Sequence, residues 1–155
     1  MESNIDLKAA ESLYMIGEAK RLMNQYSSAL VEYSKAIKIA SDIPDRKITA
    51  KIQVGLAHTH ILLGNISRSQ SYLDGADKIS DSLDIKETKV YVSYCRALIL
   101  KQKGYTKESF EILSDILKLS YTMPDKTLKA LIEHQIGRLY SQQKNKKGIL
   151  PRKNC

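Results

Sequence analysis

The sequence is 155 residues long and carries a net charge of +8, with 25 Lys and Arg against 17 Asp and Glu. Its 43% hydrophobic and 27% charged residues are typical of a globular domain and exclude general disorder or a collagen-like fibre. No run approaches the ~20 apolar residues of a membrane-spanning helix. The chain also begins without the basic-then-apolar pattern of a signal peptide, so we expect one intracellular, cytoplasmic protein.

In chain order, the sequence predicts a succession of helices separated by short turns. Apolar residues recur at helical spacing, for example Leu30, Tyr33 and Ile37 in one segment and Phe110 and Leu113 in another. No run alternates in the manner of a strand, so the predicted fold class is all-α. The helices are expected at 6–23, 26–41, 46–63, 66–83, 86–103, 106–121 and 125–143.

These helices belong to a unit that repeats every 40 residues. Turn-forming residues stand at Asn24, Gly64 and Gly104, and each is followed five residues later by a small residue. Pro44 and Pro124 lie two periods apart where helices must end. Small residues at one further register position allow close helix packing, and these are Gly17, Ala57, Ala97 and Gly137. Asp45, Asp125 and Asp84 are predicted N-caps, the last in a capping box with Glu87.

The repeat resembles the tetratricopeptide (TPR) family across about 10–143. The first unit carries the pattern in Leu13–Gly17, Asn24–Ala29, Tyr33 and Ala36. The resemblance implies an α-solenoid of antiparallel helix pairs, with about three TPR-like repeats and a C-terminal capping helix forming a domain over 1–143. Two features depart from the family: the period is 40 residues rather than about 34, and Gln53 stands where a large apolar residue is usual.

The same resemblance implies that the first helix of each pair lines a concave groove that binds a peptide or a helix of a partner protein. Groove tyrosines beside mixed charges suit such a ligand, although tyrosines at these positions can equally pack against neighbouring helices. Glu18 occupies a position where chaperone-binding TPRs hold a carboxylate, which disfavours that mode of binding. The expected groove residues are Tyr14, Glu18, Arg21, Lys51, Val54, His58, Tyr91, Tyr94, Leu98, Lys101, His134 and Arg138.

Catalytic and metal sites are not expected. His58 and His60 point about 200° apart on a helix, so they cannot share a metal ion. Cys95 lies in an apolar helical segment and is expected to be a buried, inert thiol, whereas Cys155 is expected to be exposed. The sequence therefore predicts a non-enzymatic interaction module, an adaptor or scaffold, with no cofactor and no small-molecule substrate.

The C-terminal residues 144–155 differ from the rest of the chain because they contain five cationic residues and no acid. They are interpreted as a basic, disordered tail, which leaves the helical body nearly balanced in charge. Two further functions remain open. One is a peptide-sensing TPR portion of a transcriptional or signalling regulator, truncated from a longer array. The other, less favoured, is nucleic-acid binding through the tail.

Overall fold

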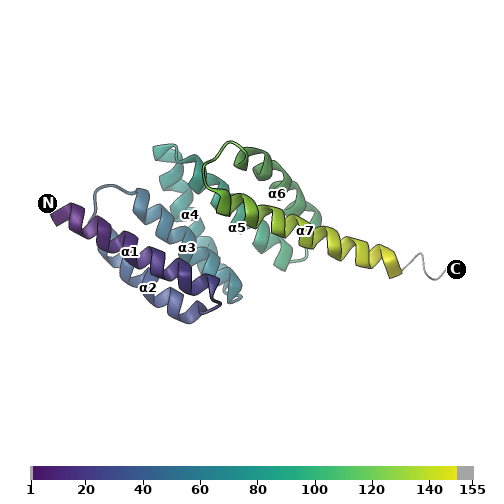
Figure 1. Ribbon diagram of the computed structural model, residues 1–155, viewed down its shortest axis with the longest axis horizontal. Helices are drawn as coiled ribbons and strands as arrows, with labels where there is room; N and C mark the ends of the chain where they lie inside the picture. The colour runs from purple at the N-terminus through teal and green to yellow at the C-terminus, as the bar shows by residue number, and fades with distance from the viewer. Residues whose placement is uncertain (1, 150–155) are drawn as a thin grey trace. The chain divides into compact units, whose positions relative to one another are not determined.

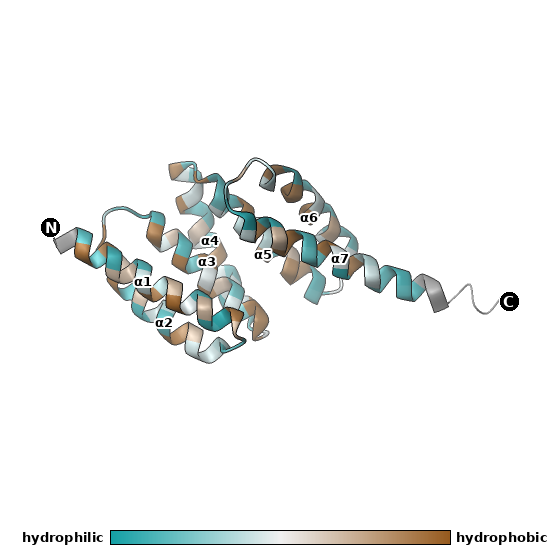
Figure 2. Ribbon diagram, in the orientation of Figure 1, coloured by the Kyte–Doolittle hydropathy of each residue, from teal (hydrophilic) through white to brown (hydrophobic). Residues whose placement is uncertain are grey.

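The computed structural model describes residues 2–149, and these residues form seven α-helices and no strand (Figure 1). The all-α prediction is confirmed, and most observed helix ends lie within a residue or two of the predicted ones. Successive helices run antiparallel in pairs, and Figure 2 shows apolar and polar residues alternating along them, as amphipathic helices require. The helices are α1 (Glu2–Leu22), α2 (Tyr26–Ala40), α3 (Lys47–Leu62), α4 (Ile66–Leu83), α5 (Lys86–Gln102), α6 (Thr106–Ser120) and α7 (Lys126–Ile149).

The turn within each helix pair has the same hydrogen bonds, 40 residues apart. Asn24, Gly64 and Gly104 all adopt positive φ, at 61°, 82° and 90°. The residue after each donates its N–H to a carbonyl five residues earlier, as in Asn65 N to His60 O at 2.8 Å. This is the Schellman arrangement, which satisfies the last carbonyls of a helix and favours glycine or asparagine at the left-handed position. The predicted turn signals are therefore confirmed.

Two of the three predicted N-caps are also confirmed. Asp45 Oδ1 accepts the backbone N–H of Lys47 at 3.0 Å, and Asp125 Oδ1 accepts that of Thr127 at 2.9 Å. Asp84 instead ends α4 in the left-handed conformation, with φ 52°, and its carboxylate contacts the Lys89 ammonium at 3.3 Å. The predicted capping box at Asp84 is wrong because this residue is the C-cap of the preceding helix, α4.

The chain divides into two compact units, Met1–Cys95 and Arg96–Cys155. In the first unit α1, α2 and α3 share one core, whose fully buried members include Tyr33, Ile52 and Leu56. In the second unit α6 packs on α7, and Leu113 and Leu139 are fully buried. The core of each unit is built from residues of the repeat pattern.

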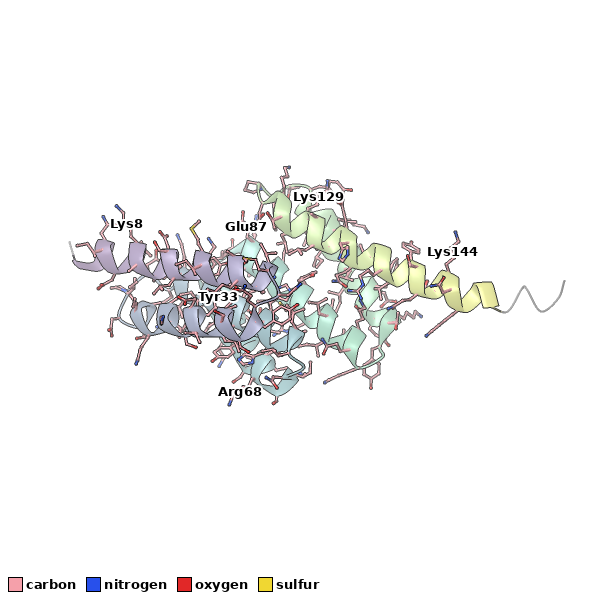
Figure 3. The ribbon with its side chains drawn as sticks, turned by 60° about the horizontal axis from the view of Figure 1, so that its bottom comes forward. Lys8, Tyr33, Arg68, Glu87, Lys129 and Lys144 are labelled. Carbon is pink, nitrogen blue, oxygen red and sulfur yellow. The ribbon has the colours of Figure 1, made fainter. Side chains whose placement is uncertain are left out.

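Helix α7 is longer than the sequence analysis predicts. It continues to Ile149, so residues 144–149 of the expected tail are helical, and the Lys144 side chain points away from the helix (Figure 3). Lysine predominates in this extension, and its long unbranched side chain is compatible with a helix. Residues 150–155, with Cys155, lie outside the described residues, and the domain boundary at 143 stays a prediction.

Candidate functional site

The candidate site begins at Tyr33 of α2, whose ring lies against two glycines of neighbouring helices. A Cβ added at Gly17 of α1 would lie 2.7 Å from the Tyr33 ring, and one added at Gly55 of α3 would lie 2.8 Å from it. Any side chain at either glycine would therefore displace the ring. The two glycines allow an aromatic residue to fill the space among α1, α2 and α3, with the hydroxyl directed toward Glu18.

A chain of polar side chains continues from this hydroxyl across four helices of the first unit. Tyr33 donates to Glu18 Oε1, and Arg21 Nη2 donates to Glu18 Oε2 at 2.8 Å. Arg21 Nη2 also lies 3.5 Å from Tyr91 Oη of α5, at the outer limit of a hydrogen bond. Tyr91 Oη in turn lies 2.9 Å from Nδ1 of His58 in α3. The first helices of three successive pairs, α1, α3 and α5, are thus connected through side chains.

The chemistry of the members decides part of the hydrogen-bond pattern. Arginine can only donate, so Tyr91 Oη accepts from Arg21, while the hydrogen bond between Tyr91 Oη and His58 Nδ1 is donated by one or the other according to the tautomer of His58. Burial, followed by the positive charge of Arg21, lowers the pKa of His58 to about 3, so its imidazole is neutral at physiological pH. Burial also raises the pKa of Tyr91 well above its ordinary value.

Aromatic contacts surround the end of this chain. The rings of His58, Tyr91 and Tyr94 meet in three edge-to-face pairs with centroid separations of 5.6–5.8 Å. At the other end, the Lys51 ammonium lies 5.5 Å from the centroid of the Tyr14 ring, within cation–π range. The polar chain and its aromatic neighbours together make a continuous layer on α1, α3 and α5, which we call the tyrosine–arginine network.

The structure brings together most groove residues predicted for the first unit, but it buries several of them. Arg21, Val54, His58 and Tyr94 are at most 5% exposed. Tyr14, Glu18 and Tyr91 are half-buried, and Lys51 is exposed. Side chains of the chain itself therefore fill much of the predicted groove floor. Whether a partner contacts the exposed remainder stays a prediction.

The groove residues of the second unit are arranged separately. Leu98 is buried, and Lys101 Nζ donates to Gln135 Oε1 at 3.0 Å. Burial, and then the nearby positive charge of Arg138, lowers the pKa of Lys101. His134 and Arg138 lie exposed on α7. This unit thus offers a small cationic surface over α5 and α7.

Sequence reasoning missed one member of the site. Tyr33 was expected only as an apolar core residue, although a tyrosine where the other repeats have Leu73 and Leu113 signals a hydroxyl that needs a partner. The stacking of His60 on Tyr72 outside the site, with centroids 5.8 Å apart and planes at 9°, was also missed. His58 and His60 do point to different neighbours, as expected.

Cys95 is a buried free thiol, as predicted, and burial raises its pKa. Among the described residues, no three His, Cys, Asp or Glu side chains gather as a metal site would require. No helix in the described part of the chain is long and apolar enough to span a membrane.

The succession of antiparallel helix pairs, repeated with the same turn, defines a helical-repeat protein of the α-solenoid class. Residues 10–43, which contain most of α1 and all of α2, match the family model described as tetratricopeptide repeat. A TPR-like protein from Chlorobium tepidum has a similar structure, with a TM-score of 0.66 and 17% sequence identity over 90% of this chain and 99% of that one. No curated protein matches the sequence significantly.

The first helix pair matches the tetratricopeptide repeat model, and the fold is similar to that of a TPR-like protein; together these matches support a TPR family assignment. Members of the TPR family are typically non-enzymatic protein-interaction modules. Neither match names a partner.

Proposed function

We propose that the protein is a cytoplasmic adaptor or scaffold that binds a peptide or helix of a partner protein on the exposed residues of α1, α3 and α5. The observation that carries this proposal is the tyrosine–arginine network, which holds residues of three successive first helices in fixed positions. A surface that is already ordered loses little conformational entropy on binding. The adaptor role and the cytoplasmic location are supported by the family resemblance alone.

The exposed residues around the network limit the chemistry of the ligand. Lys51 offers a cation over the half-buried ring of Tyr14, and Glu18 is one-quarter exposed beside it. A peptide with an acidic side chain next to an apolar one would meet complementary groups here. His134 and Arg138 of the second unit supply further exposed groups for the same class of ligand.

The test uses exposed residues, because replacing the buried Tyr94 or His58 would disturb the fold. Partners captured by the full chain from lysate are identified by mass spectrometry, and the best candidate is purified and titrated calorimetrically. Lys51→Glu is expected to weaken binding by about tenfold, corresponding to a lost interaction of about 1.4 kcal/mol. The matched control, Lys78→Glu on the exposed surface of α4, should bind as the wild type does. Equal affinities for all three chains would overturn the groove proposal.

A further inference from the structure

We propose that the outer face of the α1–α2 pair, on the side away from α3, is the interface of a symmetric homodimer. This inference goes beyond the proposed function because it concerns a different surface. It rests on the repeat register, on a hollow between α1 and α2, and on the order of charges along that hollow.

The repeat register identifies this face as one that elsewhere packs against a helix pair. Ile48, Ile52 and Leu56 of α3 belong to the core shared with α1 and α2 and are at most 5% exposed. The residues 40 positions earlier, Lys8, Ser12 and Ile16, are all exposed on α1. The first helix therefore carries the stacking face of a repeat, and no helix among the described residues of the first unit covers it.

This stacking face of α1 is notably apolar. Ile5, Met15, Ile16 and Met23 are between 44% and 69% exposed, and Ala19 lies among them at helical spacing. A cluster of large apolar side chains left in water is unfavourable and marks an interaction surface. Lys8 points outward from the same helix (Figure 3), so the face is not uniformly apolar.

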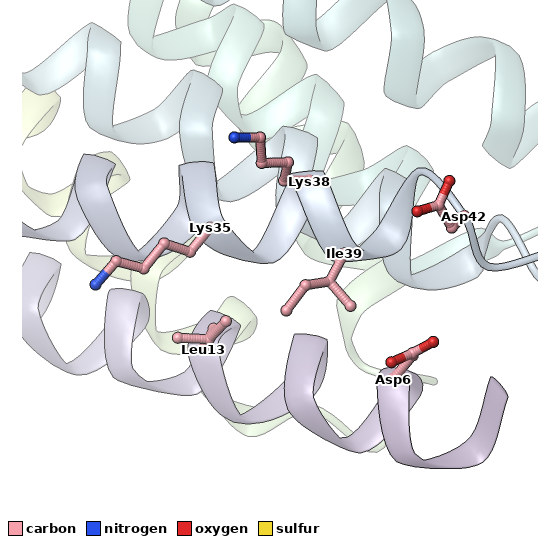
Figure 4. Close-up of a pocket in the computed structure, with 6 residues that line it drawn as sticks. All are labelled: Asp6, Leu13, Lys35, Lys38, Ile39 and Asp42. Atoms are coloured by element: carbon pink, nitrogen blue, oxygen red, sulfur yellow. The ribbon is translucent and has the colours of Figure 1, made fainter. Parts of the chain in front are cut away.

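A hollow of about 470 Å³ lies next to this stripe, between α1 and α2. Leu13 and Ile39 form its apolar floor, as the close-up in Figure 4 shows. The carboxylates of Asp6 and Asp42 lie at one end, and the Lys35 ammonium lies at the other. Its lining residues are Asp6, Leu13, Lys35, Lys38, Ile39 and Asp42.

This order of charges is complementary to itself. A two-fold axis through the middle of the hollow would place the carboxylate end of one copy on the Lys35 end of the other. Figure 4 shows Lys35 beside Leu13, so the two ends are separated by the seven residues from Asp6 to Leu13, or about 10 Å of helix.

A second copy fits this face better than a partner of uniform charge. An acidic partner would leave Asp6 and Asp42 opposite like charges, and a basic partner would do the same to Lys35 and Lys38. An identical face rotated by 180° satisfies both ends at once, as isologous dimers do. The Lys35 ammonium forms an ion pair with Glu32 at 3.6 Å, but the Lys35 side chain is 59% exposed, so its ammonium is accessible to a second carboxylate.

The test is a charge exchange, followed by sedimentation and light scattering of the full chain. The wild type is expected to dimerise reversibly with a Kd below about 200 µM. Both methods detect association of this strength. Asp6→Lys and Lys35→Glu should each weaken dimerisation at least about tenfold, because each places like charges opposite one another. The double variant Asp6→Lys/Lys35→Glu should restore the dimer, because opposite charges again meet.

Restored dimerisation of the double variant distinguishes a specific interface from a folding defect. If each single substitution impaired folding, combining the two would not restore the dimer. Glu111→Lys, on the exposed surface of α6, is the matched control and should dimerise normally. A wild-type chain that stays monomeric overturns the proposal. So does a dimer that the single variants leave intact, or a double variant that stays monomeric. Partner binding measured on the same variants reports separately on the groove, because neither residue belongs to it.

Discussion

Gly17 of α1 and Tyr33 of α2 fit so closely that a Cβ at position 17 would lie 2.7 Å from the ring of Tyr33. The contact is specific to the first repeat, because the second has Ala57 and Leu73 at the same positions. Relative to the second repeat, the first therefore has a smaller residue at one of these positions and a larger residue at the other.

The first prediction concerns this pair. Gly17→Ala should lower the free energy of unfolding by about 2 kcal/mol, because a rigid, fully buried ring cannot move aside without cost. The double variant Gly17→Ala/Tyr33→Leu, which reproduces the pairing of the second repeat, should lose less than the sum of its two single variants. Urea denaturation of the four chains measures this coupling. Strict additivity would contradict the close-contact explanation.

The second prediction compares two glycines that have open space around them. Gly64 has φ +82°, so Gly64→Ala should cost about 1 kcal/mol through backbone strain alone. Gly137 lies inside α7 with no atom within 4 Å of an added Cβ, so Gly137→Ala should stabilise by roughly 0.5–1 kcal/mol. Thermal unfolding of both variants checks the opposite signs, and shifts in the same direction would refute the distinction.

The third prediction concerns the charge that holds Arg21. Glu18→Gln should reduce stability by about 2 kcal/mol, because it leaves a buried guanidinium without its counterion. The cost stays below that of a fully buried pair, since Glu18 is one-quarter exposed and water can reach it. Glu11→Gln, seven residues earlier on the same helix and exposed, should change stability by less than about 0.5 kcal/mol. Similar losses in the two variants would count against the network.

The fourth prediction is a loss of stability in mild acid. The pKa of His58 is about 3 in the fold and 6.5 in the unfolded chain, so the unfolded state binds the extra proton between these values. Stability should be full above pH 6.5 and should decrease as the pH falls toward 3, by about 1.4 kcal/mol per pH unit at most. Urea titrations at a series of pH values measure the slope.

The variant His58→Gln should reduce this slope, because its side-chain amide can still hydrogen-bond to Tyr91 but does not titrate. A smaller dependence should remain, since burial also lowers the pKa of His60. If His58→Gln kept the full wild-type slope, protonation of His58 could not be its cause.

The fifth prediction concerns the buried thiol. Cys95 should react with a thiol reagent at least about a hundredfold more slowly in the folded protein than in urea, because burial blocks access and raises the thiol pKa. Peptide mapping by mass spectrometry identifies the labelled residue. Rapid labelling of Cys95 under native conditions would show that the helices around it open readily.

The features that the sequence predicted correctly are those set by short segments. The turns at Asn24, Gly64 and Gly104 depend on which residues tolerate positive φ, and the caps at Asp45 and Asp125 depend on a side chain two residues from its donor. Such rules involve residues only a few positions apart in the sequence, so the repeat pattern was sufficient to predict these turns and caps. Asp84 shows their limit, because a good cap residue can also end the preceding helix.

The site was harder to predict because it depends on residues far apart in the sequence. The pattern assigned Arg21 and Tyr91 to the same predicted groove, yet it gave no sign that they contact each other across 70 residues. Whether a position lining a groove is open or filled depends on the volumes of all side chains around it. The periodic pattern specifies which side of each helix faces the groove and leaves these volumes undetermined.

The polar chain from Tyr33 to His58 also restricts how this array could evolve. Repeat proteins commonly lengthen by duplicating a unit, which succeeds when each unit contacts its neighbours in the same way. Here the first helices of the three pairs make different contributions. Arg21 lies on α1, His58 on α3 and Tyr91 on α5. A copied unit inserted among them would separate donor from acceptor. The N-terminal half of the chain is therefore a fixed set of helices, whose order selection must preserve.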